Sequence, residues 1–242
     1  MQEQIFEKMT RMRLFGMKRA FLQSMEASST NYTPDEMIAY LINAEWDDRH
    51  NRKIERLTKA ARFRYMANIE ELLFDPNRNL DQNLVQRLAT CDFIRKGENL
   101  LITGSTGVGK SYLASAIGHQ ACNSGLRVMY FNLNRLFTQL KMAKADGSYL
   151  QRVAKIEKQD LLILDDFGLK PLDAQKSHLL MDILEDRHGK KSTLIAAQIP
   201  VAAWHQLIDE STLADAILDR LLHQAHRIEL KGESLRKRKP NF

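Results

Sequence analysis

The sequence predicts an α/β protein in which a mostly parallel five-stranded sheet is flanked by helices and preceded by an all-helical region. Three observations favour this fold class. From Glu98 onward, apolar runs of strand length alternate with amphipathic stretches of helix length, a pattern typical of parallel sheets covered on both faces. Before about residue 90 the apolar periodicity is helical throughout. A glycine-rich turn joins the first predicted strand to the helix that follows it.

The N-terminal region is predicted to contain an amphipathic helix followed by one long helix. Apolar side chains recur at spacings of three and four between Leu14 and Met25, forming one stripe. Thr33 is expected to be the N-cap of the second helix, with Pro34 at its first position and Glu36 completing a capping box. The second helix is expected to reach about Met66, a length of about 50 Å at 1.5 Å per residue.

The C-terminal region is predicted to alternate strands and helices. Strands are expected at residues 99–103, 127–131, 160–164, 193–197 and 227–230, and helices at 110–123, 133–157, 173–188 and 200–222. We place the change of architecture between Leu80 and Gly97. The predicted domains are a helical DNA-binding and assembly domain at 1–80, a nucleotide-binding domain at 81–235 and a basic tail at 236–242.

Composition excludes several classes of protein. The chain has 242 residues, of which 44% are hydrophobic and 27% charged, values typical of an ordered globular protein. No apolar run is long enough to span a membrane, and the N-terminus has no apolar secretory core. Cys91 and Cys122 are the only cysteines. We therefore expect a cytoplasmic protein with no membrane partner, no disulfide framework and no thiolate metal site.

A phosphate-binding loop follows the first predicted strand. The segment fits G-x-x-x-x-G-K-[ST] at every fixed position, directly after an apolar run and directly before a helical stretch. A chance glycine-rich turn is disfavoured because this context is complete. Lys110 is expected to reach the β- and γ-phosphates of ATP, and the Ser111 hydroxyl to bind Mg²⁺. The residues predicted to bind nucleotide are Gly104, Ser105, Thr106, Gly107, Val108, Gly109, Lys110 and Ser111.

Two acidic residues end the third predicted strand. Asp165 and Asp166 directly follow the apolar run that ends at Leu164. Asp165 is expected to bind Mg²⁺, directly or through a water, and Asp166 to polarise the attacking water. An apolar strand followed by aspartate is weak support alone, since loops commonly begin with Asp, but the phosphate loop makes the pair specific.

Two further polar residues are candidates for the ATP chemistry. Gln198 follows the fourth predicted strand and could orient the water or sense the γ-phosphate; the alternative is a simple turn residue before Ile199-Pro200. Arg220 lies in an otherwise apolar helical stretch. It could be an arginine finger that enters the ATP site of a neighbouring subunit, or a solvated helix residue.

Together these segments resemble the IstB family. The resemblance is carried by the phosphate loop, the strand end Leu161–Gly168, the Gln198-Ile199-Pro200 segment with Trp204, and the tail Leu218–Arg236. It extends over essentially the whole chain. IstB proteins are the ATPase helpers encoded beside the transposase in two-gene bacterial insertion sequences, related to DnaC helicase loaders and the DnaA initiator.

The resemblance implies an AAA+ ATPase core in which Gln198 is the sensor and Arg220 the finger. Two features depart from most AAA+ enzymes: the second acid is Asp166 in place of Glu, and the sensor is Gln in place of Asn or Thr. No helical lid is expected after the last strand, so a second sensor must come from the tail, where Arg236 is the candidate. The stretch between Asn132 and Lys158 suits the extra helix of initiator-type members.

Positive charge is concentrated near the end of the long predicted helix. The chain carries a net charge of +6, and residues 49–64 contain a single acid, Glu55. On a helical wheel at about 100° per residue the basic side chains share one face, and a solvated surface is the alternative to binding a polyanion. No base-reading motif is present, so contact with the phosphate backbone of DNA is expected. The predicted DNA-binding residues are Arg49, Arg52, Lys53, Arg56, Lys59 and Arg64.

The sequence therefore predicts an ATPase that forms homo-oligomers on double-stranded DNA with ATP at the subunit interfaces. By resemblance, the assembly deforms target DNA and recruits the transposase of the same element. A replicative helicase loader is the alternative with the same core, and it would hold single-stranded DNA. A metabolite kinase is disfavoured, because no residues for an acceptor pocket are recognised and the basic helix would remain unexplained.

Overall fold

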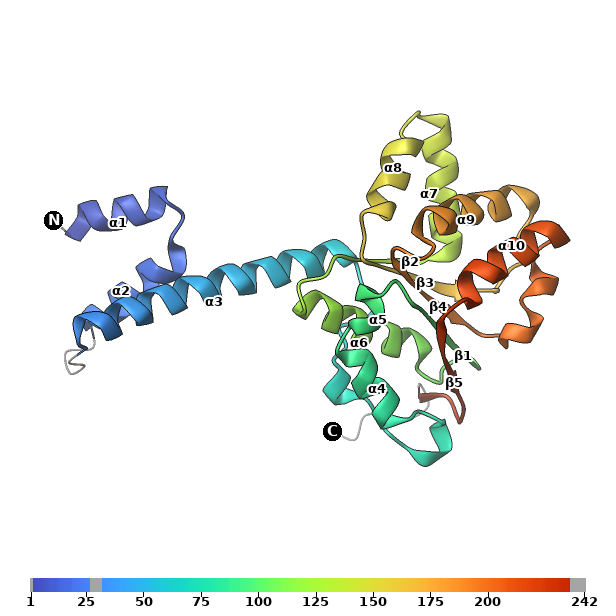
Figure 1. The fold of residues 1–242 in the computed structure, drawn as a ribbon, viewed down its shortest axis with the longest axis horizontal. Coiled ribbons are helices and arrows are strands. Elements are labelled where there is room, and N and C mark those ends of the chain that lie inside the picture. Colours follow the sequence, from blue (N-terminus) through green and yellow to red (C-terminus); the bar gives the residue numbers. More distant parts are fainter. Residues whose placement is uncertain (1, 27–31, 236–242) are drawn as a thin grey trace. The chain divides into compact units, whose positions relative to one another are not determined.

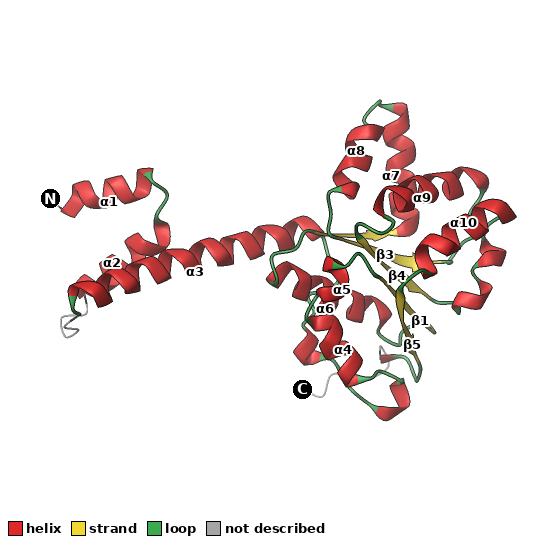
Figure 2. Ribbon diagram, in the orientation of Figure 1, coloured by secondary structure: helices red, strands yellow, loops and turns green. Residues whose placement is uncertain are grey.

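The computed structural model describes residues 2–26 and 32–235, and within them five strands form one parallel sheet (Figures 1 and 2). The strand order is β2-β3-β4-β1-β5. All four strand pairs are parallel, which confirms the predicted sheet. The strands are β1 (Asn99–Gly104), β2 (Val128–Asn132), β3 (Leu161–Phe167), β4 (Ser192–Ala197) and β5 (Ala225–Leu230).

Helices cover both faces of the sheet, as the alternation of elements predicts (Figure 2). Side chains that alternate along β1 explain this, because Leu100 and Ile102 join one apolar cluster while Leu101 joins the other. The first face carries α4 (Gln82–Ala89), α5 (Asp92–Arg95) and α6 (Lys110–Asn123). The second face carries α7 (Leu133–Ala145), α8 (Tyr149–Glu157), α9 (Ala174–Arg187) and α10 (Ser211–Leu222).

The N-terminal unit consists of helices only. It contains α1 (Gln2–Arg11), α2 (Phe15–Glu26) and the first part of α3 (Pro34–Ala61). The buried Glu45 carboxylate accepts the backbone N–H groups of Gly16 and Met17, at 2.9 and 3.1 Å, and so binds the first turn of α2. A Cβ on Gly16 would lie 2.3 Å from the Ala44 carbonyl oxygen. Only glycine therefore permits this close approach of the two helices.

The chain separates into two compact units, residues 1–56 and 57–242. This division precedes the change of architecture that we place between Leu80 and Gly97. The reason is that residues 57–80 have no core of their own. Leu57, Phe63 and Tyr65 contact the cluster beneath α6, and Ala67 and Leu72 are buried within it. The short helical turns at 69–71 and 76–78 belong to the same layer.

The start of α3 is confirmed and its end differs from the prediction. Thr33 and Glu36 form the capping box, in which the Thr33 N–H donates to Glu36 Oε2 at 2.8 Å and the Glu36 N–H to Thr33 Oγ1 at 3.3 Å. The helix ends at Ala61, before Met66, because Arg62 adopts a left-handed conformation with φ of 59°. Such a residue is a common helix terminator.

Two other predicted helices are shorter in the structure. The stretch 133–157 divides into α7 and α8 at Gly147, which has a φ of 76° that favours glycine. In the stretch 200–222 only α10 is a regular helix, preceded by two short 3-10 turns. No helix follows β5 within the described residues, so no helical lid is observed there. In that same part of the chain, every helix is too short or too polar to cross a bilayer.

Candidate active site

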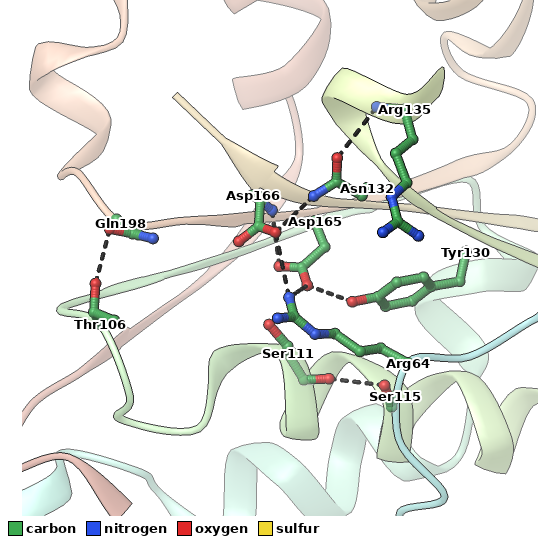
Figure 3. Close-up of polar contacts among 10 residues, drawn as sticks. All are labelled: Arg64, Thr106, Ser111, Ser115, Tyr130, Asn132, Arg135, Asp165, Asp166 and Gln198. Atoms are coloured by element: carbon green, nitrogen blue, oxygen red, sulfur yellow. Dashed lines mark hydrogen bonds and ion pairs between the residues drawn. The ribbon is translucent and has the colours of Figure 1, made fainter. Parts of the chain in front are cut away.

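The predicted catalytic segments meet at the carboxyl edge of three adjacent strands. The phosphate loop follows β1, Asp165 and Asp166 lie at the end of β3, and Gln198 follows β4. The register aligns Thr103 of β1 and Phe167 of β3 with the same residue of β4. Thr106 donates its hydroxyl to Gln198 Oε1 at 2.9 Å (Figure 3). The parallel sheet therefore brings together residues that are far apart in the sequence.

The phosphate loop curls around the Lys110 side chain. Gly109 is the N-cap of α6 with a φ of 101°, a conformation that is strained for any residue with a Cβ. Lys110 Nζ donates to the carbonyl oxygens of Gly104 and Ser105 at 2.7 and 2.8 Å, and the lysine is buried. The loop thereby places an ammonium group and the N-terminus of a helix in one concave turn, which is a strong site for phosphate.

Arg78 supports the phosphate loop from behind, and no pattern in the sequence indicated this role. Its guanidinium is buried and donates to the carbonyl oxygens of Val108 and Leu73 at 2.7 and 2.8 Å. The tail after β5 contacts the loop from another direction, since the Leu235 N–H donates to the Gly107 carbonyl at 2.9 Å. These contacts hold the loop in its conformation.

Asp165 is buried at the start of an irregularity in the sheet. The β3–β4 register shifts between Leu164 and Phe167, so the ladder is interrupted at the two aspartates. Asp165 Oδ2 accepts the hydroxyl of Tyr130, from β2, and Oδ1 accepts the Asp166 N–H at 2.8 Å. Burial and the Asp165 carboxylate raise the pKa of Tyr130, so its hydroxyl remains a donor. Tyr130 is a second residue that sequence reasoning missed.

Asp166 adopts a left-handed conformation with φ of 61°, which turns its side chain toward β2. There the Asn132 side-chain amide N–H donates to Asp166 Oδ2 at 2.7 Å, while Asn132 Oδ1 accepts the Arg135 backbone N–H at 3.2 Å and caps α7. Arg64 donates to both carboxylates, at 3.4 Å from Asp165 Oδ2 and 3.2 Å from Asp166 Oδ2 (Figure 3). Asp166 is therefore held at Oδ2 by an amide and a guanidinium, and its Oδ1 accepts no hydrogen bond from the part of the chain that the structure describes.

The oxygen ligands at this edge fit Mg²⁺. Ser111 in the first turn of α6 presents a hydroxyl near Asp165 (Figure 3), and a hydroxyl with a carboxylate is the donor set that Mg²⁺ shares with nucleotide phosphates and water. Within residues 2–26 and 32–235, no cluster of three or more His, Cys, Asp or Glu side chains is arranged to hold a metal ion. The protein would therefore hold the cation together with the nucleotide.

An apolar cavity of about 220 Å³ adjoins Gly109. Tyr112 at its edge donates its hydroxyl to Glu71 at 2.5 Å. Burial and this carboxylate raise the pKa of Tyr112 to about 12, while the hydrogen bonds from Tyr112 and Asn68 lower the pKa of Glu71. The apolar side chains around the cavity come from Leu72, Leu73, Leu80, Leu113 and Leu235.

Arg220 lies at the opposite edge of the sheet from the phosphate loop. Its backbone carbonyl accepts the side-chain amide of Asn99, the first residue of β1, at 2.9 Å, whereas the loop follows the last residue of that strand. The guanidinium forms an ion pair with Glu185 of α9. Arg220 therefore cannot contact the phosphate loop of its own chain.

The predicted basic stripe, the face of the long helix that carries the predicted DNA-binding residues, is only partly correct. Arg64 is not on α3, which ends at Ala61, and its side chain contacts the carboxylates of Asp165 and Asp166. Part of the positive charge on this face is also neutralised, because Glu45 pairs with Arg49 at 2.6 Å and Asp48 with Arg52 at 2.6 Å. Both acids lie on the preceding turn of the helix, outside the segment from which the stripe was predicted.

A basic groove nevertheless remains in the N-terminal unit. Its volume is about 360 Å³, and Lys53 and Arg56 in it have no acidic partner among the described residues. Lys59 is exposed in the last turn of α3. Arg236, the candidate second sensor, lies outside the described residues. The groove is lined by Met12, Arg13, Arg49, Arg52, Lys53 and Arg56.

Comparison with known proteins agrees with this geometry. The family model of IstB-like ATP-binding proteins matches residues 7–241. The chain belongs to this family. It is 44% identical to the insertion sequence ATP-binding protein y4pL of Sinorhizobium fredii, over 96% of this chain and 95% of that protein. It is 38% identical to the ATP-binding protein of insertion sequence IS1162 from Pseudomonas fluorescens, over 83% of this chain and 87% of that protein.

Solved structures with the same fold include replication proteins. The DnaC helicase loader matches 69% of this IstB-family chain and 98% of its own, with a TM-score of 0.60 and 22% identity. AMPPCP-bound DnaA from Aquifex aeolicus matches 71% of this chain and 52% of its own, with a TM-score of 0.58 and 17% identity. These likenesses establish the AAA+ fold. Together with the family match, they identify the chain as an AAA+ ATPase associated with insertion sequences.

Proposed function

We propose that this IstB-family protein hydrolyses ATP to ADP and phosphate while assembled on duplex DNA, and thereby prepares target DNA for the transposase of its insertion sequence. The single observation that carries the proposal is the convergence of the phosphate loop, Asp165, Asp166 and Gln198 at one edge of the sheet. Relatives of closely matching length are named as insertion sequence ATP-binding proteins, which supports the transposition context.

In the hydrolysis step each residue at this edge of the sheet has a separate role. Lys110 leaves the loop carbonyls and donates to the β- and γ-phosphates, with the backbone N–H groups of the loop on either side. Ser111 and Asp165 would hold Mg²⁺, which would offset the negative charge of the phosphates. Asp166 polarises the attacking water through Oδ1, since Asn132 holds Oδ2. Gln198, next to Thr106, contacts the γ-phosphate side of the site.

The adenine base is assigned to the apolar cavity beside Gly109. Its volume of about 220 Å³ and its leucine side chains suit a flat apolar ring. The hydroxyl of Tyr112, at the edge of the cavity, is held by Glu71. Placing the base there puts the triphosphate along the loop toward Ser111 and Asp165, which is the direction that the chemistry needs.

Assembly completes the site. Arg220 is remote from the phosphate loop of its own chain, so a role in the chemistry requires the nucleotide of a neighbouring protomer. A guanidinium supplied in this way offsets charge on the transferred phosphate and makes hydrolysis depend on oligomerisation. The ion pair with Glu185 holds the side chain at the molecular surface.

The N-terminal unit provides the proposed DNA contact and a surface for protein contact. The basic groove, with Lys53 and Arg56 unpaired by acids among the described residues, suits the phosphate backbone of a duplex. Ile38, Ile42 and Trp46 lie four residues apart on α3 and are 56%, 55% and 72% exposed. Exposed apolar side chains in such a row are typical of protein interfaces, and we assign them to assembly or to the transposase.

The test compares a charge reversal in the groove with a matched reversal elsewhere. R52E/K53E/R56E should weaken binding to duplexes of every sequence, and its log–log salt slope should fall by about 0.9 for each DNA phosphate that the variant no longer neutralises. The control R87E/R95E/K96E changes the net charge equally on α4, α5 and the residue after α5 and should keep the wild-type slope. Fluorescence anisotropy with a non-hydrolysable ATP analogue measures both. An unchanged slope in the groove variant would place the DNA elsewhere, and a preference for single strands would favour a helicase loader.

A further inference from the structure

Arg64 has a place in the site that the proposed chemistry does not use. It follows the end of α3 by three residues and reaches both aspartates, donating from Nη1 at 3.4 Å to Asp165 Oδ2 and at 3.2 Å to Asp166 Oδ2. Although partial burial opposes its charge, the neighbouring Tyr65 and the two carboxylates raise the pKa of Arg64. One cationic group thus lies against both carboxylates assigned to the metal and the water, next to Ser111 (Figure 3).

The backbone around Arg64 is anchored, while its side chain is free to turn. A Cβ on Gly118 would lie 2.4 Å from the Phe63 ring, and the Phe63 and His119 rings are 4.2 Å apart, so Phe63 is packed tightly on α6. In contrast, the Arg64 side chain is 40% exposed. A cavity of about 500 Å³ bounded by Arg62, Asn132 and Arg135 adjoins it. Arg64 can therefore leave the carboxylates without moving the segment that carries it.

The guanidinium takes up one of the acceptor positions on Asp165 that would otherwise be open to a metal-bound water. Each carboxylate oxygen offers two acceptor sites. Oδ1 accepts the Asp166 N–H, and Oδ2 accepts both Tyr130 and Arg64. Tyr130 is buried whereas the Arg64 side chain is partly exposed, so the exchangeable partner on Oδ2 is Arg64. Repulsion between a guanidinium and a divalent cation at this separation also opposes their simultaneous binding.

We propose that Arg64 is a positioning residue that competes with the nucleotide-bound divalent cation at Asp165. When the cation is on Asp165, Arg64 turns into the adjoining cavity; when it is not, Arg64 neutralises the two acids and holds their side chains in place. This inference rests on the proposed ATP site. Arg64 would then determine how strongly nucleotide affinity depends on Mg²⁺, and it would connect the site to the segment that directly follows α3.

The test measures nucleotide affinity with and without Mg²⁺ in R64Q, with R87Q as the matched control. Arg87 is exposed on α4, away from the cavity, and makes no ion pair within the described residues. Binding of a fluorescent ADP is titrated over Mg²⁺, from excess EDTA to saturation. R64Q should bind ADP about fivefold tighter at subsaturating Mg²⁺, the scale of one partly exposed ion pair. In EDTA it should bind more weakly, because the phosphates then face two bare carboxylates. R87Q should change neither value.

Opposite shifts in the two conditions are the signature of competition, and a purely structural role would not produce them. Weaker binding by R64Q in both conditions would mean that Arg64 contacts the phosphates, and equal binding in both would remove it from the site; either result overturns the proposal. R64K provides a second variant that keeps the charge and should lie between R64Q and wild type. If wild type itself binds no nucleotide with Mg²⁺, the proposed function fails, which is a different outcome.

Discussion

Replacing Arg78 with methionine tests whether the phosphate loop is held from behind by a buried arginine. The substitution keeps most of the side-chain volume and removes the donors to the carbonyl oxygens of Val108 and Leu73. Val108 is fully buried, whereas the Leu73 side chain is 51% exposed, so water can reach the Leu73 backbone more easily. An unsatisfied buried acceptor costs about 1–3 kcal/mol. We therefore expect the free energy of unfolding to fall by about 2–3 kcal/mol, most of it from Val108.

Urea denaturation followed by the fluorescence of Trp204 measures this loss. Trp204 is fully buried in the second apolar cluster and Trp46 is 72% exposed, so a W46F background leaves one reporter of the sheet core. The expected shift of the urea midpoint is about 1–1.5 M for a slope of about 2 kcal/mol per M. R87M, an exposed arginine on α4, should leave the midpoint unchanged. A loss under about 0.5 kcal/mol for R78M, the ordinary range for surface substitutions, would refute the assigned support.

Three other outcomes are expected. D166N should keep nucleotide affinity and lower phosphate release by about 100-fold or more, since an amide cannot accept the proton; turnover near wild type would assign the base to another group. R220A and K110A should each lack ATPase activity alone and recover part of it when mixed, because one supplies the loop and the other the finger; a mixture as inactive as its components would contradict a role between protomers. Burial opposes ionisation of Asp160, yet Arg127 and Lys191 lower its pKa from 3.8 to about 2. The folded-state pKa is below the unfolded value, so this stabilisation is complete above about pH 4 and is lost as the pH falls toward 2. D160N should therefore be less stable than wild type by about 1–2 kcal/mol at neutral pH, after allowance for solvent screening, with the gap closing below pH 4; a gap independent of pH would exclude this ion pair as its cause.

Local patterns were sufficient to predict the order of the five strands and the helical stretches between them, but not the separate helices α1, α4 and α5. Strands β1 to β4 each contain a short apolar run, whereas β5 alternates apolar and polar residues, and the capping box at Thr33 is entirely local. The break between α7 and α8 had a local signal that we did not use: Asp146-Gly147-Ser148 forms a turn in which Asp146 accepts the Ser148 N–H at 2.9 Å. The irregular segment after Pro200 had a weaker local signal, because the spacing of its apolar residues continues the helical pattern.

The site was predictable where its residues are contiguous and not where they come from distant segments. The phosphate loop and the Asp165-Asp166 pair could be recognised from short runs of sequence. Arg64, Tyr130 and Asn132 could not, because the sheet and the segment after α3 bring them to the carboxylates. Arg78 is 30 residues before Val108 and has no motif of its own. Periodicity places a residue on a face of one element, but it does not say which other element covers that face.

The error in the basic stripe has the opposite cause, because here a local signal was present in the sequence and was not used. Glu45 and Asp48 precede Arg49 and Arg52 by four residues, the spacing at which charges pair on a helix. Extending the helical wheel by one turn would have revealed that part of the positive charge is neutralised. Predicting Arg64 on the same face failed for another reason, since a left-handed residue at Arg62 ends the helix.

The most direct measurement compares the affinity for a duplex oligonucleotide with and without a non-hydrolysable ATP analogue, at fixed salt and protein concentration. If nucleotide bound between protomers builds the DNA-binding assembly, the analogue should raise the affinity strongly for wild type and not for K110A. Equal binding of wild type to the duplex in the absence of any nucleotide would contradict the account at its centre.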